Sequence, residues 1–338
     1  MSRTPTQLRP LSAQNAVLAR ADGSASFAFG TLSAYASTTG PLESRIRDEL
    51  IDRAALQINI TPLTGLPTIS SRGLGQGLRE LFESVVLLHL HPRSVVQVNV
   101  QLVTGPPGFV PPPRTSVTSD AILIGDDDDD EEQEGGGGGG GGKSTAIRKL
   151  RPSAPHPNST FSASQRATII NAAMLALLDS GLAMQATVAA CACAVLPAKE
   201  ASRLRKRRRR SDDGGDVDTQ MDAEGSHAEH VLVLDPSPEE EYYATSTHVF
   251  AFGFAGKSTP PAREWSHDEK SYDIADLAPA AGDGRRNADE EEEILYAESH
   301  GPVGLETYAD AADQCRRAAR GLIVPFYRRW LSQHHAKQ

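Results

Sequence analysis

The chain of 338 residues alternates between blocks with a hydrophobic pattern and blocks without one, which limits what it can fold into. The patterned blocks are residues 8–103, 158–197, 228–256 and 294–335. The blocks between them, 104–157, 198–227 and 257–293, are rich in Pro, Gly, Asp, Glu and Arg. They have too few apolar residues to offset an ordering entropy of about 1–2 kcal/mol per residue. Because no patterned block looks able to bury a core alone, we predict one domain over 8–335 with three disordered surface insertions.

The first patterned block predicts strands on either side of a helix. Residues 25–40 and 55–60 carry short strand-like runs, and 95–103 alternates strictly. The expected buried face of that last strand is Val96, Val98, Val100 and Leu102. Apolar residues at helical spacing form a stripe before Pro92, which should stop the helix. They are Leu78, Leu81, Phe82, Val85 and Val86.

The remaining blocks continue this mixture. A helical stripe over 169–178 ends at Gly181, and strands are expected over 187–196, 231–234 and 247–254. The last block is predicted to be helical, with Pro325 splitting it. Its apolar face would carry Leu305, Tyr308, Ala312 and Cys315. This order predicts an α+β fold with helices packed on mixed sheets.

Composition restricts the classes of function. The formal net charge of −10 argues against attraction of the whole protein to nucleic acid, although much of it lies in acidic runs such as 126–134. Cys191, Cys193 and Cys315 lack a second ligand pair for zinc, so we expect buried thiols in a reducing compartment. Residues 175–196 are too polar to span a bilayer, and the N-terminus lacks a signal peptide's apolar region. We expect a soluble intracellular protein without membrane contact.

Three local motifs resemble binding sites, and each also has a simpler interpretation. Residues 137–144 fit the P-loop expression, with Lys143 and Ser144 in place, but an acidic tract precedes them where a buried strand is required. ATP binding is therefore the weakest of three hypotheses. The basic run 203–210 fits a nuclear localisation signal or phosphate-binding patch as well as a solvated loop. His89 and His91 fit a helix end better than a metal site. We expect no cofactor and no metal.

Ordered motifs across the blocks resemble the RNase PH family. Residues 20–23 (RADG) look like its R-x-D-G signature, and 39–43 (TGPLE) look like the hairpin that ends in G-P-x-E. Residues 85–94 (VVLLHLHPRS), 170–184 (INAAMLALLDSGLAM) and 232–236 (LVLDP) are similar to eukaryotic RNA exosome ring subunits, most of all the component five type. The resemblance implies an RNase PH-like fold of the ribosomal protein S5 domain 2-like kind, interrupted by the insertions.

The same resemblance implies a degenerate phosphorolytic site. The family's D-G-G-T-R-T loop should fall at 162–167, where Ser162 replaces its Asp and Arg166 keeps its phosphate-binding arginine. Gln76 replaces an arginine of the G-R-S-L-R segment. Of two acidic positions six residues apart, Glu241 could serve as the first, but Thr247 is neutral at the second. Losing a carboxylate that places a metal ion should abolish most activity.

The leading hypothesis is therefore a non-catalytic ring subunit that helps to form an RNA channel. Arg72, Arg79, Arg93 and Arg166 are candidates for phosphate or RNA contacts, although each surface arginine fits a structural role equally well. The implied partners are other RNase PH-like ring subunits, S1/KH cap proteins, single-stranded RNA and, indirectly, docked hydrolytic nucleases. The expected location is the nucleus and nucleolus, and also the cytoplasm. The alternative is an active phosphate-dependent 3′→5′ exoribonuclease.

Overall fold

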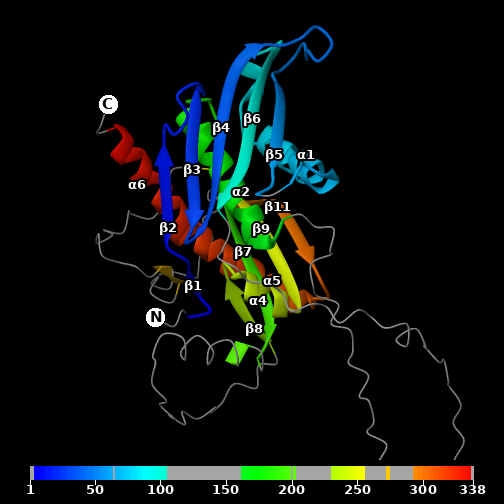
Figure 1. Ribbon diagram of the computed structural model, residues 1–338, viewed down its shortest axis with the longest axis vertical. Helices are drawn as coiled ribbons and strands as arrows, with labels where there is room; N and C mark the ends of the chain where they lie inside the picture. Colours follow the sequence, from blue (N-terminus) through cyan, green and yellow to red (C-terminus); the bar gives the residue numbers. More distant parts are fainter. Residues whose placement is uncertain are drawn as a thin grey trace, which may run out of the picture.

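The computed structural model describes residues 4–63, 65–104, 161–198, 201–202, 230–255, 272–274 and 292–335. Two large sheets lie one above the other along the long axis of the molecule, with helix α2 (Ala163–Asp179) running between them (Figure 1). One hydrophobic core includes residues of both sheets and of α2. The α+β class agrees with the expectation from the sequence, and a smaller hydrophobic cluster lies beside the main core around Leu196 and Val233.

The upper sheet has five strands in the order β2-β3-β4-β6-β5. They are β2 (Leu11–Asn15), β3 (Gly23–Phe29), β4 (Leu32–Glu43), β5 (Ala55–Thr61) and β6 (Ser94–Thr104). Strands β5 and β6 are parallel and are connected through α1 (Ile69–Glu83), whereas the other pairs are antiparallel. The four alternating side chains predicted on β6, from Val96 to Leu102, are all buried, which confirms that strand's pattern.

The lower sheet has four strands in the order β11-β9-β7-β8, all antiparallel. They are β7 (Thr187–Pro197), β8 (His230–Leu234), β9 (Ser246–Phe254) and β11 (Glu292–His300). The short helix α4 (Pro238–Tyr243) connects β8 to β9. Cys191 and Cys193 on β7 and Cys315 on helix α5 (Leu305–Ala318) are free and buried, as expected. Burial raises the pKa of the Cys315 thiol well above its usual value.

The RADG motif proves to hold the fold. An added Cβ at Gly23 would lie 2.4 Å from the backbone nitrogen of Ser180, so only glycine allows β3 to pass this close to the end of α2. The preceding Asp22 carboxylate accepts a hydrogen bond of 2.8 Å from the Gly40 backbone N–H. Inside the core, Asn171 of α2 exchanges two hydrogen bonds with the backbone of Ala190 on β7. These contacts fix α2 against both sheets.

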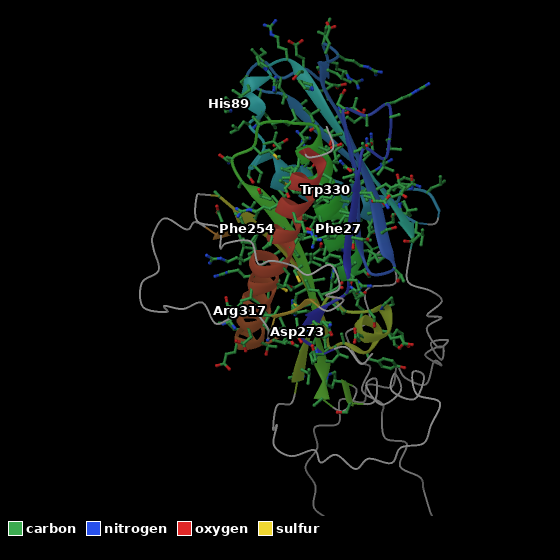
Figure 2. All side chains as sticks on the ribbon, turned by 90° about the vertical axis from the view of Figure 1, so that its left-hand side faces the viewer. Phe27, His89, Phe254, Asp273, Arg317 and Trp330 are labelled. Atoms are coloured by element: carbon green, nitrogen blue, oxygen red, sulfur yellow. The ribbon has the colours of Figure 1, made fainter. Side chains whose placement is uncertain are left out.

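The C-terminal block differs from its prediction. Residues Glu292–His300 form the edge strand β11, not a helix, and Leu305 at the start of α5 (Leu305–Ala318) is exposed. A π-helical turn, η4 (Ala319–Ile323), separates α5 from α6 (Val324–His335), as expected beside Pro325, which has no N–H to donate. Trp330 of α6 is buried, and Phe27 of β3 packs edge-on against Phe326 and Tyr327 (Figure 2).

The helix predicted to run toward Pro92 is shorter than expected. It ends at Glu83, where the Ser84 hydroxyl donates a 2.7 Å hydrogen bond to the Leu81 carbonyl. Val86 instead forms a bridge with Met184, and a 3₁₀ turn, η1 (Leu88–Leu90), contains His89. Val85 and Val86 are apolar because they are buried in the core, although they lie beyond the end of the helix. The apolar pattern in the sequence therefore extends farther than α1 itself.

The predicted insertions also contain ordered residues. Strand β10 (Tyr272–Asp273) lies within 257–293 and pairs with β1 (Gln7–Leu8), and β11 begins inside the same range. The P-loop-like segment with Lys143 and Ser144 and the basic run 203–210 lie outside the described residues. No helix within the described ranges is long and apolar enough to cross a membrane.

Candidate functional site

The first turn of α2 is the place where the resemblance put a phosphate loop. Ser162 is the N-cap: its hydroxyl accepts from the Gln165 N–H, and the Gln165 side chain accepts a 2.9 Å hydrogen bond from the Ser162 N–H. This reciprocal pair is a capping box, which satisfies two backbone donors of the helix end. Ser162, where active relatives were expected to carry Asp, therefore serves to begin the helix.

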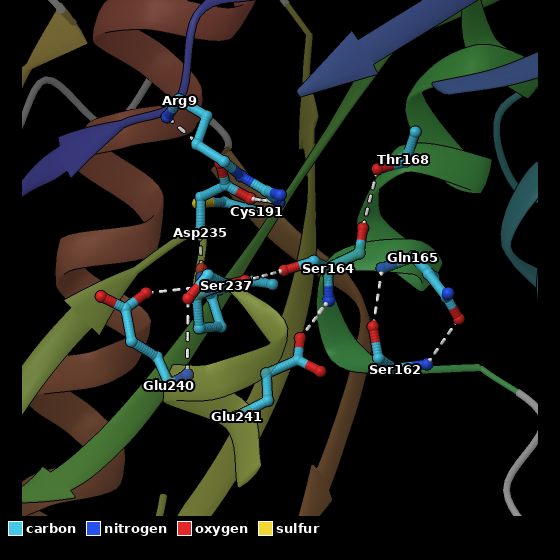
Figure 3. Close-up of polar contacts among 12 residues, drawn as sticks. Arg9, Ser162, Ser164, Gln165, Thr168, Cys191, Asp235, Ser237, Glu240 and Glu241 are labelled. Atoms are coloured by element: carbon cyan, nitrogen blue, oxygen red, sulfur yellow. Dashed lines mark hydrogen bonds and ion pairs between the residues drawn. The ribbon is translucent and has the colours of Figure 1, made fainter. Parts of the chain in front are cut away.

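A buried carboxylate occupies the same helix end (Figure 3). The Ser164 N–H donates a 2.9 Å hydrogen bond to Oε1 of Glu241, whose side chain comes from α4 and is only 5% exposed. Burial raises the Glu241 pKa to about 7, although hydrogen bonds from Ser164 and Ser162 and the nearby Arg9 oppose that rise. A helix N-terminus attracts anions because its free N–H groups point outward. Here the protein's own carboxylate takes that position.

Helix α4 is held firmly in place beneath this contact. The Ser164 hydroxyl donates a 2.6 Å hydrogen bond to the Pro236 carbonyl, and Ser237 and Glu240 form a second capping box. Arg9 binds both carboxylate oxygens of the buried Asp235 through Nε and Nη2, at 2.7 and 2.5 Å. Glu241 thus sits on a short helix that is fixed from both sides.

Arg166 is paired with a second carboxylate. Its side chain is 8% exposed, its Nε donates to the Phe161 carbonyl at 3.3 Å, and its Nη1 forms an ion pair with Glu298 of β11. Glu298 also accepts from the Tyr296 hydroxyl and lies 3.2 Å from Nε2 of His300. Burial lowers the pKa of Arg166 below its usual value, and the nearby Tyr296 and Glu241 oppose this shift only in part. We call the Ser164 N–H, Arg166, Glu241 and Glu298 the inner anion site.

Neither of the other two positions predicted to be degenerate belongs to the inner anion site. Gln76 is exposed on α1, where its side-chain amide donates a 3.0 Å hydrogen bond to Glu80. Thr247 is buried on β9 between Ala194 of β7 and His300 of β11. Its neighbour His248 is buried between the hydroxyls of Ser246 and Ser299, at 2.9 and 2.8 Å. Burial, and then His300, lower the pKa of His248 to about 4, so its ring is neutral at pH 7.

The charges of the inner anion site are matched within the protein. One cationic side chain and one helix end face two carboxylates, and the position expected to supply a second metal-placing carboxylate is Thr247. Among the residues that the structure describes, no cluster of three or more His, Cys, Asp or Glu side chains is arranged to hold a metal ion. The groups here that could attract an anion, the Ser164 N–H and Arg166, are thus already paired with Glu241 and Glu298.

The sequence did not reveal Glu298, Tyr296 and His300, because the block that contains them was predicted to be helical. Their alternate spacing places them on one face of β11. That alternation indicates a strand, but it covers only a few residues and lies next to the longer helical spacing of α5.

The three predicted surface arginines do not form one site. Arg72 is exposed in the first turn of α1, which follows the Thr61 end of β5. Arg79 pairs with Glu83 on the same helix at 2.7 Å. Arg93 precedes β6 at the opposite end of the sheet, where Ala55 of β5 pairs with Val95. Only Arg93 lies beside other exposed arginines.

Arg93 is joined to the connection between β4 and β5. Its N–H donates to the Leu50 carbonyl at 3.0 Å, and its side chain pairs with Glu49 at 3.2 Å. Residues 44–53 of this connection contain three further exposed arginines, Arg45, Arg47 and Arg53. We call residues 44–53 together with Arg93 the outer arginine loop. The sequence shows these residues plainly, but no pattern in it joins them to Arg93.

Comparison with known proteins identifies the family. Residues 7–183, just over half of the chain, match the 3′ exoribonuclease family, domain 1. The chain belongs to this family. The inner anion site falls at the end of the matched region, where α2 begins, and its two carboxylates come from the part of the chain that follows it.

Several individual relatives within this family are exosome proteins named Rrp46. The exosome complex component rrp46 of Schizosaccharomyces pombe is 25% identical over 87 residues, 26% of this chain and 38% of that protein. RRP46 of Saccharomyces cerevisiae is 31% identical over 91 residues, 27% of this chain and 41% of that protein. The Oryza sativa exosome complex exonuclease RRP46 homolog is 30% identical over 109 residues, 32% of this chain and 46% of that protein. The chain therefore spans less than half the length of these curated relatives.

A solved structure confirms the fold. The crystal structure of rice Rrp46 matches with a TM-score of 0.56, covering 98% of each chain at 18% sequence identity. The RNase PH-like architecture predicted from the motifs is thus confirmed.

Proposed function

We propose that this protein is a ring subunit of an RNA exosome that supports 3′→5′ RNA processing and decay without catalysing it. The family and the exosome components among its relatives support the first part. The observation that carries the second part is the inner anion site. Glu241 binds the helix end, and Glu298 binds Arg166, where a phosphate ion would otherwise be held.

The charges also explain why phosphate would not displace these carboxylates. Glu241 is tethered by α4, and Glu298 is held by the pairing of β11 with β9. A tethered partner binds at high effective concentration, whereas free phosphate has to be desolvated and ordered. Its negative charge would also meet that of Glu298 and, in the molecules in which Glu241 is ionised, a second carboxylate.

Labelled single-stranded RNA tests the catalytic question. The purified full chain is incubated with RNA, magnesium and inorganic phosphate, and nucleoside diphosphates are measured. We expect none above the no-enzyme background, for wild type and for Arg166→Ala alike. Diphosphates that require phosphate and disappear with Arg166→Ala would establish the alternative, a phosphate-dependent 3′→5′ exoribonuclease.

Assembly is tested separately. The proposed partners are other RNase PH-like ring subunits, S1/KH cap proteins and single-stranded RNA, with hydrolytic nucleases docked on the ring. Native mass spectrometry of the complex purified through a tag on this chain should give a heteromeric ring that contains one copy of it. A chain found only by itself or only with copies of itself would contradict the proposal.

The proposed locations are the nucleus, the nucleolus and the cytoplasm. The basic run 203–210 supports a nuclear address by its composition. A fluorescent fusion should lose nuclear enrichment when Arg207, Arg208, Arg209 and Arg210 are all replaced by Ala. An unchanged distribution would remove the run from the proposal.

A further inference from the structure

The N-terminal segment is closed by a small clasp. Strand β1 pairs with β10 in a two-stranded sheet whose register joins Gln7 to Asp273 and Leu8 to Tyr272. Strand β10 comes from the block that follows β9, and Ile274 beside it packs against the main core and donates a 3.4 Å hydrogen bond to the Thr6 carbonyl. A ladder of two residue pairs is marginal in water and opens locally at low cost.

Two threonine hydroxyls meet one carboxylate across the clasp. The Thr4 hydroxyl donates a 2.5 Å hydrogen bond to Oδ2 of Asp273, and the Thr6 hydroxyl donates a 2.7 Å hydrogen bond to Oδ1. Asp273 is labelled in Figure 2. The Thr4 side chain is exposed. Any added negative charge on Thr4 would therefore stand directly against Asp273.

Thr4 is followed by Pro5, the pair that proline-directed protein kinases recognise. The described residues contain two other such pairs, Thr61-Pro62 and Ser237-Pro238, and both hydroxyl residues are half-buried. The Ser237 hydroxyl is also committed to capping α4. Exposure thus singles out Thr4 among the three.

We propose that Thr4 is a phosphorylation site whose modification opens the clasp between β1 and β10. A proline-directed kinase would transfer the γ-phosphoryl group of ATP. A bond forms between the Thr4 oxygen and the γ-phosphorus, the bond from that phosphorus to the β–γ bridging oxygen breaks, and ADP leaves. The hydroxyl proton passes to the base of the kinase. This site goes beyond the proposed exosome function and does not depend on it.

The consequence follows from charge. Phosphorylation removes the hydroxyl that donates to Asp273 and adds a group of charge about −1.5 to −2 at pH 7. Repulsion from the Asp273 carboxylate then separates the two strands. The opening should stop near Pro5, because the Leu234 N–H binds the Pro5 carbonyl at 2.9 Å and Arg9 is fixed by Asp235. Phosphate on Thr4 would therefore release β10 and leave the two large sheets intact.

Hydrogen exchange tests the proposal on the full chain. The protein is phosphorylated with a proline-directed kinase and ATP, and the modified residues are mapped by mass spectrometry. We expect phosphate on Thr4 in wild type and its absence in Thr4→Val. Amide exchange in peptides covering 272–274 should become at least tenfold faster in the phosphorylated chain, with no change in α2.

Two variants separate electrostatic opening from simple loss of a contact. Asp273→Asn should keep slow exchange after phosphorylation, because the repelling charge is gone. Thr4→Val should accelerate exchange far less than phosphate does. The proposal is overturned if Thr4 is not modified, or if the phosphorylated and unmodified chains exchange equally at 272–274.

Discussion

The inner anion site and the outer arginine loop hold their arginines in opposite ways. Arg166 is buried with Glu298, and a second carboxylate, Glu241, binds the nearby helix end. Arg47 and Arg93 also have carboxylate partners, Asp48 and Glu49, but these arginines are 87% and 68% exposed. The two regions differ in solvent exposure rather than in the presence of a partner.

That difference bears on the proposed contacts with RNA. A surface ion pair contributes about 0–1 kcal/mol, so a phosphate of RNA can replace its carboxylate at little cost. A buried pair resists exchange, because removing one partner leaves the other charge desolvated. An arginine at a position where the family binds phosphate therefore indicates phosphate binding only if the group that it faces is also known.

The largest expected effect compares a buried and an exposed pair directly. Asp235→Ala leaves Arg9, 13% exposed, without its partner and should lower the free energy of unfolding by about 3–5 kcal/mol. The matched change Asp48→Ala, at the exposed pair with Arg47, should cost less than about 1 kcal/mol. Urea denaturation of both variants measures the contrast. Equal losses would show that burial does not distinguish the two regions.

The second prediction uses pH. The pKa of Glu241 rises from 4.5 in the unfolded chain to about 7 in the folded one, so the folded state retains its proton in the window between them. The free energy of unfolding therefore falls as pH rises through that window, by an amount on the order of 3 kcal/mol from this group. Glu241→Gln, a neutral mimic of the protonated acid, should remove that fall and be more stable than wild type at pH 8.

The difference in the free energy of unfolding between wild type and Glu241→Gln, followed against pH, isolates the contribution of Glu241. His248, whose pKa is lowered to about 4, contributes with the opposite sign: its stabilisation is lost as pH falls below 6.5. Both chains share that contribution. Denaturation midpoints at pH 5, 6, 7 and 8 provide the measurement, and Glu80→Gln on the exposed face of α1 is the control. Parallel curves for wild type and Glu241→Gln would refute a raised pKa.

The third prediction concerns RNA. Replacing Arg45, Arg47 and Arg93 together by Gln should weaken binding of single-stranded RNA and make the slope of log affinity against log salt shallower by about 2, since each phosphate contact contributes about 0.7. Arg166→Gln should leave both values unchanged. Fluorescence anisotropy at several salt concentrations tests this, with the chain in its ring. A loss at Arg166 that exceeds the loss at the loop would reverse the comparison.

The smallest effect is expected on α1. Arg79→Ala removes a partly exposed pair with Glu83 one helical turn away and should cost about 0.3–0.5 kcal/mol. RNA affinity should not change, because the loop lies at the other end of β6 and β5. Thermal unfolding and the same anisotropy assay check both points. A clear drop in affinity would add Arg79 to the RNA-contacting residues.

Much of the fold could be predicted from local pattern, because period-2 and helical spacing leave clear traces in β6 and α2. The helix prediction for the start of the C-terminal block was wrong for a physical reason. Strand β11 lies at a sheet edge, where its partner β9 decides its conformation. A nearby helical stripe over α5 then dominated the prediction.

The sequence by itself determined the family motifs and the α+β class, and it predicted losses at Ser162, Gln76 and Thr247. It also placed Arg166 at the start of α2, because that position depends on neighbours in the chain. Only the tertiary structure decided what Arg166 and the helix end face. Glu241 and Glu298 lie 75 and 132 residues farther along the chain, and the packing of α4 and β11 brings them to one point. Electrostatic pairing acts over a few ångströms of space, which sequence spacing does not encode.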